Sequence, residues 1–128
     1  MSAIDELLDA IESAQVAGCA AFADDATLDA TVPNWRLHRS GADAVRAQLA
    51  GWFEHPGHFE RLERTPLPGG ELVEYELAWQ EDGVPHAAHQ LHRLHTIDGR
   101  IVADTMFCGG RWPASLLAEM QAADDAEG

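Results

Sequence analysis

The spacing of hydrophobic residues changes along the chain, from the helical period in the first half to strand alternation in the second. Apolar residues recur every three or four positions over residues 2–22 and predict a helix with Ser2 as its N-cap. Two short strands are predicted at residues 27–32 and 35–38. A second helix is predicted over residues 41–53, with Ser40 as its cap, because its apolar residues share one face.

The second half predicts a loop followed by an antiparallel meander. Residues 55–70 contain several prolines and glycines and predict a loop around one strand at 58–64. Three strands and two tight turns are then expected: strands at 71–80, 84–96 and 100–108, and turns at Asp82-Gly83 and Ile97-Asp98-Gly99. Gly109-Gly110 is expected to end the last strand, and Pro113 to begin a short final helix.

Helices early in the chain and an antiparallel sheet late in it predict an α+β roll. The 128 residues, 1–128, fit a single domain, with no internal repeat and no linker. A sheet that curls around the helices can leave a pocket on its concave face.

Charge and composition narrow the possible partners. All eight basic residues are arginine, against 22 acidic ones, so the formal net charge is −14. Nucleic acids and anionic membrane surfaces are therefore not expected as partners. Without lysine there is no Schiff-base or Walker-type chemistry. We see no signal peptide and no apolar run long enough to span a membrane, and we expect a cytoplasmic protein.

Turn lengths assign side chains to the concave face. The acidic residues of strand 71–80 alternate with apolar ones, so its apolar set should point inward. A two-residue Asp82-Gly83 turn then pairs Trp79 with His86, and Tyr75 with Gln90. A three-residue loop after the next strand pairs His92 with Asp104, and brings Met106 and Cys108 onto the same face.

This last pairing depends on the length of the turn. A two-residue turn at Asp98-Gly99 would instead place Arg93 opposite Asp104. We expect the register of the three-residue loop.

His92 and Asp104 are the strongest candidates for catalysis. A carboxylate beside an imidazole fixes its tautomer, and in an apolar pocket the two can act as general base or acid. The alternative is a buried pair that only ties two strands together. Tyr75, the single tyrosine, needs a partner for its hydroxyl, and Gln90 is the predicted neighbour; a simple core tyrosine is the alternative.

No cofactor and no metal ion is expected. His86, His89, His92 and His95 recur every third position, whereas ligands on one strand face recur every second; a bulge could still bring them together. Cys108 reads as a small buried hydrophobe and not as a nucleophile. No dinucleotide-binding, serine-hydrolase or zinc-protease motif occurs.

Three segments resemble the SnoaL-like, or nuclear-transport-factor-2-like, superfamily. They are Phe22-Ala23-Asp24-Asp25 after the first helix, Gly41-Ala42-Asp43-Ala44-Val45 at the start of the second, and the hairpin from Leu94 to Ile101. The resemblance covers most of the chain. It implies a cone-shaped α+β roll, in which the N-terminal helices pack on a strongly curved antiparallel sheet around a deep apolar pocket, commonly as a homodimer.

Members of that superfamily include isomerases, cyclases, dehydratases and proteins without known activity, so the fold does not give the function. We expect a cofactor-independent enzyme that moves a proton on an apolar carbonyl-bearing or cyclic molecule. His92 and Asp104 would be catalytic; the predicted substrate-binding residues are Tyr75, Gln90, His86, Trp79, Trp35, Met106 and Cys108. The alternative is a non-catalytic binding or dimeric interaction module.

Overall fold

The first helix begins where the sequence predicts and ends earlier. The computed structural model describes residues 1–128, and α1 spans Ala3–Ser13. Ser2 caps it: its hydroxyl accepts from the Asp5 amide, and the Asp5 carboxylate accepts from the Ser2 amide. Ala14 has a left-handed backbone (φ 58°) and closes the helix. The predicted continuation to residue 22 is therefore wrong, and the short helix η1 (Val16–Gly18) occupies part of that stretch.

The second helix is confirmed, but its predicted cap is wrong. α2 spans Ala42–Trp52 and has Gly41, without a side-chain cap, at its N-cap position. Ser40 is the last residue of strand β2 (Trp35–Ser40), and its hydroxyl bonds His38 Nε2 instead.

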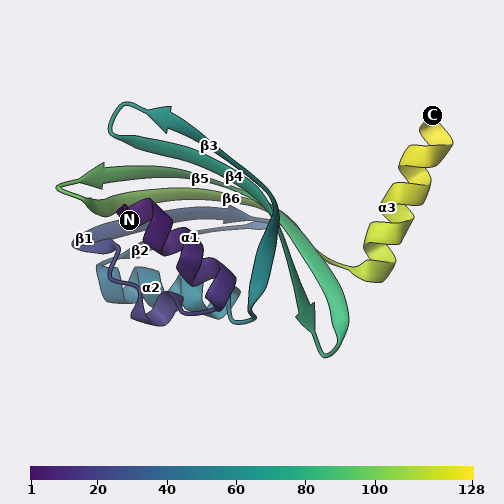
Figure 1. Cartoon of the computed structure of the whole chain (residues 1–128), viewed down its shortest axis with the longest axis horizontal. Helices are drawn as coiled ribbons and strands as arrows, with labels where there is room; N and C mark the ends of the chain where they lie inside the picture. The colour runs from purple at the N-terminus through teal and green to yellow at the C-terminus, as the bar shows by residue number, and fades with distance from the viewer.

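Six strands form one curved, open sheet on which α1 and α2 lie (Figure 1). The strand order is β2-β1-β6-β5-β4-β3. Besides β2, the strands are β1 (Phe22–Val32), β3 (Gly57–Leu67), β4 (Gly70–Glu81), β5 (Val84–Ile97) and β6 (Arg100–Pro113). Neighbouring strands are antiparallel except β1 and β6, which run parallel. The α+β prediction is confirmed, with a mixed sheet in place of a purely antiparallel one.

Two strand boundaries correct the sequence prediction. The predicted loop at 55–70 is mostly strand β3, which tolerates Pro66 because it lies at the sheet edge. β6 does not end at Gly109-Gly110 but continues to Pro113. Helix α3 (Ala114–Glu127) follows and is longer than the expected short helix.

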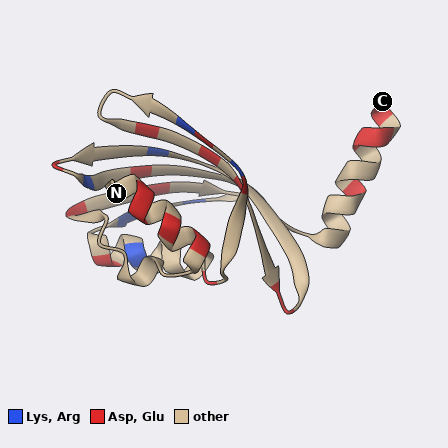
Figure 2. Cartoon of the chain, in the orientation of Figure 1, with Lys and Arg blue, Asp and Glu red and all other residues tan.

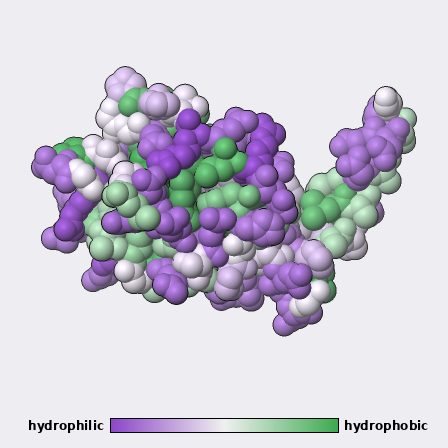
Figure 3. All heavy atoms as spheres, viewed as in Figure 1, coloured by the Kyte–Doolittle hydropathy of each residue, from purple (hydrophilic) through white to green (hydrophobic).

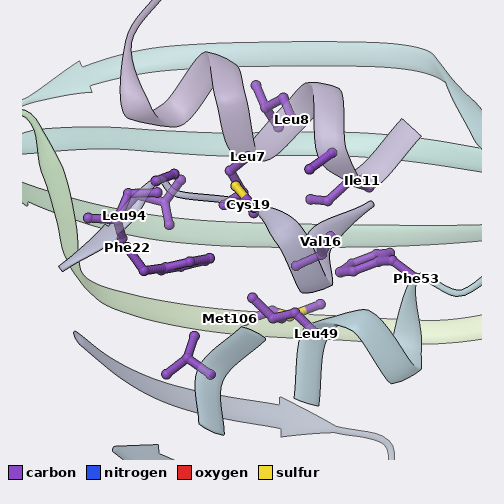
Figure 4. Packing of buried hydrophobic residues seen from close by; sticks show 14 of the residues in the cluster. Leu7, Leu8, Ile11, Val16, Cys19, Phe22, Leu49, Phe53, Leu94 and Met106 are labelled. Atoms are coloured by element: carbon purple, nitrogen blue, oxygen red, sulfur yellow. The ribbon is translucent and has the colours of Figure 1, made fainter. Parts of the chain in front are cut away.

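The hydrophobic core lies between the concave face of the sheet and the first two helices. Figure 4 shows Leu7 and Ile11 of α1 and Leu49 of α2 converging on Phe22 and Met106 of the sheet. All five side chains are at most 1% exposed. Burial of this face holds the helices on the sheet and closes one side of its hollow.

Helix α3 leaves the body of the protein at the end of β6 (Figure 1). None of its residues is buried, and Leu116 and Met120 are each 37% exposed. Figure 3 shows hydrophobic residues along the part of this helix nearest the body. None of the helices combines the length and apolar composition that a membrane crossing requires.

Candidate functional site

The register between β4 and β5 is the one predicted from the Asp82-Gly83 turn. Tyr75 lies opposite Gln90, and Trp79 lies opposite His86. The backbone of Asp82 and Gly83 has positive φ (51° and 77°), as a two-residue hairpin turn requires.

The register between β5 and β6 begins as the two-residue alternative predicts, but neither predicted partner of Asp104 is observed. Ile97 pairs with Arg100, so the turn has two residues, but a bulge at Val102 then shifts the strand by one position. His92 lies opposite Met106, and Asp104 lies opposite Leu94. The predicted direct pairing of His92 with Asp104 is wrong, although the bulge keeps both side chains on the concave face. They meet diagonally across the two strands.

Five side chains on this face form a continuous chain of hydrogen bonds. His92 Nδ1 lies 2.9 Å and 3.0 Å from the two carboxylate oxygens of Asp104. His92 Nε2 lies 2.8 Å from the hydroxyl oxygen of Tyr75, which donates to Gln90 Oε1 at 2.6 Å. The Gln90 amide nitrogen in turn donates to Cys108 Sγ at 3.3 Å. The chain thus runs from a buried carboxylate to a thiol.

With the Gln90 amide oxygen facing Tyr75, a count of the available hydrogens assigns the protons of this arrangement. A phenol has one hydrogen, and Tyr75 donates it to Gln90. The hydrogen between Tyr75 and His92 therefore belongs to Nε2. A further proton lies between Nδ1 and the Asp104 carboxylate, because two acceptors facing each other would repel.

The inner part of the chain is closed off from solvent. Asp104, His92 and Tyr75 are each 1% exposed, and Gln90 is 5% exposed. Burial raises the pKa of the Tyr75 hydroxyl well above its ordinary value, and the charge of Asp104 adds to this effect. Tyr75 is therefore a neutral hydrogen-bond donor at physiological pH.

A cavity of about 290 Å³ adjoins the outer end of the chain. It is lined by Val32, Pro33, Trp52, Gln90, Met106, Cys108, Gly110 and Arg111. Three of the predicted substrate-binding residues, Gln90, Met106 and Cys108, are in this wall. The cavity wall does not include His92, Asp104 or Tyr75; the hydrogen bond from Tyr75 to Gln90 connects them to it.

The remaining predicted binding residues lie outside this cavity. Trp79 and His86 stack with ring centroids 5.7 Å apart, and both line a separate surface hollow of about 360 Å³ beside β3. Trp79 also lines a cleft of about 10 Å³ next to Gln90. Such a cleft holds no more than about one water molecule. Trp35 is 70% exposed at the β1–β2 turn, so the prediction that it lines the pocket is wrong; Val32 and Pro33 of the same hairpin take that position.

Sequence reasoning missed Trp52 and Arg111 as cavity residues. Trp52 belongs to the apolar face predicted for the second helix, which indicates a core position, but it is only partly buried and lines the cavity. Arg111 lies beyond the predicted strand end and reaches the cavity because β6 continues past Gly109-Gly110. Only the length of the strand, which those glycines obscure, could have indicated it. No three His, Cys, Asp or Glu side chains come close enough to hold a metal ion.

Comparisons with known proteins show the fold. The sequence matches no protein-family profile and no curated protein. Among solved structures, a nuclear-transport-factor-2-like protein of unknown function from Mesorhizobium loti superposes with a TM-score of 0.67 at 19% identity, over 84% of this chain and 88% of the other.

Two further structures carry names that suggest enzymes. A candidate isomerase from Bacillus subtilis superposes with a TM-score of 0.68 at 13% identity, over 84% of each chain. A candidate polyketide cyclase from Xanthomonas campestris superposes with a TM-score of 0.64 at 13% identity, over 82% of this chain and 86% of the other. At these identities the likeness shows a shared nuclear-transport-factor-2-like fold, as the sequence resemblance predicts.

Proposed function

We propose that this chain is a cofactor-independent enzyme that catalyses proton transfer next to a carbonyl group of a small apolar molecule. The observation that carries the proposal is the hydrogen-bond chain from Asp104 through His92 and Tyr75 to the cavity wall at Gln90. Names of structural neighbours support the same class of chemistry, since they include a candidate isomerase and a candidate polyketide cyclase.

A contribution to fold stability does not by itself account for this series of buried hydrogen bonds. Replacing a buried ion pair by apolar residues of similar volume is often neutral or stabilising. Asp104 and His92 nevertheless occupy a face whose other residues are mostly apolar. The protonated His92–Asp104 pair is hydrogen-bonded to the Tyr75 hydroxyl and can replace a proton that Tyr75 gives up as a general acid.

Gln90 marks the position of the substrate carbonyl. Its own amide oxygen accepts a 2.6 Å hydrogen bond from Tyr75, so this is a position where a carbonyl oxygen is held. When Gln90 turns aside, a substrate carbonyl takes its place. Tyr75 gives its hydrogen to that oxygen, and Nε2–H of His92 replaces it. The proton on the neighbouring carbon passes to water in the cavity, which leaves an enol that can isomerise, cyclise or eliminate.

Hydrogen exchange tests this step without knowledge of the product. The protein is incubated in D₂O with a panel of apolar ketones, such as 2-tetralone and cyclohexanone, and the loss of the signal of the hydrogens beside the carbonyl is followed by NMR. We expect the wild type to accelerate exchange of at least one ketone. Tyr75→Phe, which keeps the ring, should slow that exchange about a hundredfold, the usual cost of losing one donor to a developing oxyanion.

A matched control is available on the outer face of the same strands. His89 Nε2 lies 2.6 Å from Glu74 Oε2, so this is also a histidine–carboxylate pair, but it faces away from the cavity. His89→Gln should exchange at the wild-type rate. Equal rates in Tyr75→Phe and the wild type, or no exchange of any ketone by folded protein, would refute the proposed activity.

A binding module is the second candidate function, and one observation favours it. His92 and Asp104 are each 1% exposed and do not line the cavity while Gln90 is in place. Under this reading ketones bind with no gain in exchange rate. The homodimer and the cytoplasmic location predicted from the sequence stay predictions. Sedimentation equilibrium would measure the oligomeric state.

A further inference from the structure

The wall of the cavity carries a single charged side chain, Arg111. It is the one Arg, Lys, Asp or Glu among the residues that line the 290 Å³ space. Its side chain is 42% exposed, whereas Gln90 and Met106 of the same wall are 5% and 1% exposed. Arg111 therefore lies at the rim, and Gln90 and Met106 form the floor.

A bulge in β6 is the reason why Arg111 reaches this face. Gln90 pairs with Cys108, but Ala88, two residues along β5, pairs with Arg111, so β6 carries one extra residue between them. Without it, strict alternation from Cys108 would place Arg111 on the convex face. Gly110, with φ of 139°, supplies the backbone conformation that this insertion needs.

Neighbouring side chains hold the guanidinium in place and leave most of its donors free. Its central carbon lies 4.9 Å from the centroid of the Trp79 ring, and its Nη2 donates to Glu81 Oε1 at 2.6 Å. That is the one hydrogen bond the guanidinium makes in the protein, out of five possible donors. An anion that enters the cavity can therefore be bound by the remaining donors.

Glu81 does not depend on Arg111 for its charge compensation. It also accepts from Trp79 Nε1 at 2.9 Å, and His55 and His86 lie 3.8 Å and 3.9 Å from its carboxylate oxygens. The Trp79 hydrogen bond, ahead of Arg111, holds the pKa of Glu81 below its ordinary value. Arg111 can turn towards a ligand without leaving Glu81 unpaired.

We propose that the molecule taken by this cavity carries a carboxylate near its carbonyl group, and that Arg111 binds the carboxylate. This inference rests on the proposed function and names its substrate class: a small apolar keto acid, with the carbonyl at Gln90 and Tyr75 and the anionic group at the rim. Gln90 and Ala88, the partner of Arg111, are two residues apart, about 7 Å along a strand, which sets the separation of the two groups. A cavity of this size suits a small ligand.

The protein as a whole repels anions, which makes the test selective. With a formal net charge of −14, non-specific binding of a carboxylate is disfavoured, and any preference for one must arise locally. The probes are 2-naphthoate and its neutral isostere 2-naphthamide, and their affinities are measured by isothermal titration calorimetry. We expect the wild type to bind the acid more tightly than the amide.

Three variants locate the source of that preference. Arg111→Gln should weaken naphthoate binding about tenfold or more, the usual worth of a charged hydrogen bond, and leave the amide unchanged. Glu81→Gln keeps an acceptor for Trp79 but releases Arg111, and should strengthen naphthoate binding about two- to fivefold. Arg100→Gln, the same change at the opposite end of β6, is the control and should alter neither affinity.

The outcomes separate this inference from the proposed activity. Equal affinities for acid and amide, a preference that survives Arg111→Gln, or no binding of either probe would each overturn the keto-acid inference. If ketone exchange is catalysed all the same, the proton-transfer activity stands. If the acid preference follows Arg111 but no ketone exchanges, the anion site stands and the activity does not.

Discussion

Burial of only one of the two side chains, His92 or Asp104, would lower the stability of the fold. Each side chain is 1% exposed, and the two bonds between them, 2.9 Å and 3.0 Å, share one ring nitrogen. Taking two such groups out of water costs several kcal/mol each, and their mutual attraction only offsets that cost. Loss of one partner should therefore be far more damaging than loss of both.

A double-mutant cycle measures this coupling. His92→Leu leaves the Asp104 carboxylate buried and unpaired, so we expect the free energy of unfolding to fall by about 3–5 kcal/mol. His92→Leu with Asp104→Leu should recover part of that loss. Urea denaturation followed by circular dichroism gives both values.

The same change on the outer face serves as the reference. His89→Leu breaks an exposed pair with Glu74 and should change stability by no more than about 1 kcal/mol. A similar small cost for His92→Leu would show that water reaches the buried pair.

The faces of these residues were predictable, and their neighbours were not. Strand alternation placed Tyr75, Gln90, His92 and Asp104 on one side, and the turn at Asp82-Gly83 set the first register. The contact between His92 and Asp104 depends on an extra residue at Val102, within a run of apolar residues where no glycine or proline indicates a bulge. That displacement follows from packing of the whole sheet, which no local pattern contains.

At the scale of elements, the C-terminal half of β6 determines which residues reach the cavity. The sequence predicted that Gly109-Gly110 ends the strand, because paired glycines usually interrupt one. Here they permit a bulge, and the strand continues for three further residues to Pro113. The prediction for β3 failed in the same direction, because Pro66 and the flanking glycines suggested a loop, whereas the edge position of the strand makes them acceptable.

Gly110 is the residue on which this bulge depends. An added Cβ would lie 2.6 Å from Trp112 Nε1, and its φ of 139° is unfavourable for other residues. We expect Gly110→Ala to lower stability by about 1–3 kcal/mol and to remove the preference for 2-naphthoate, because Arg111 loses its place at the rim. Thermal unfolding and calorimetry measure the two effects.

Gly51 of α2 provides the matched control. It has open space around it and lies inside a helix, so Gly51→Ala should stabilise the protein by about 0.5–1 kcal/mol and leave ligand binding intact. If Gly110→Ala behaves in the same way, the bulge does not require glycine.

At the scale of the whole molecule, acidic side chains dominate the surface, and one of the few arginines, Arg64, links separate elements through ion pairs. Figure 2 shows acidic residues along α1 and α3 and only scattered basic ones. Arg64 of β3 bonds Asp5 of α1 and both carboxylate oxygens of Glu71 on β4. This ion-pair network fastens the first helix to the far edge of the sheet, between residues 59 positions apart in the chain.

The ion pair between Arg64 and Asp5 predicts how the stability of the protein depends on pH. The hydrogen bond from Arg64, with those from Ser2, lowers the pKa of Asp5 from 3.8 to about 2 in the folded protein. A carboxyl group with a lowered folded pKa contributes stability above its unfolded pKa and loses it as the pH falls towards the folded value. The contribution of Asp5 should therefore be constant above about pH 5 and vanish between about pH 4 and pH 2.

Thermal unfolding of wild type and Asp5→Asn between pH 2 and pH 6 tests this dependence. The difference in Tm between the two proteins should shrink as the pH falls through that window. Asp9→Asn, a change on the same helix where the carboxylate has no partner, should follow the wild-type profile. A constant difference between wild type and Asp5→Asn at all pH values would contradict the assignment.

The single hydrogen of Tyr75 also gives the buried chain a direction, and that direction can reverse. If the His92–Asp104 pair loses one proton, Nε2 becomes an acceptor and the hydrogen of Tyr75 turns towards it. Gln90 can then satisfy the Tyr75 oxygen only by rotating its amide, which exchanges the NH₂ group beside Cys108 for a carbonyl oxygen. The number of protons on the His92–Asp104 pair, which does not line the cavity, therefore determines whether Gln90 presents a hydrogen-bond donor or an acceptor to a bound ligand.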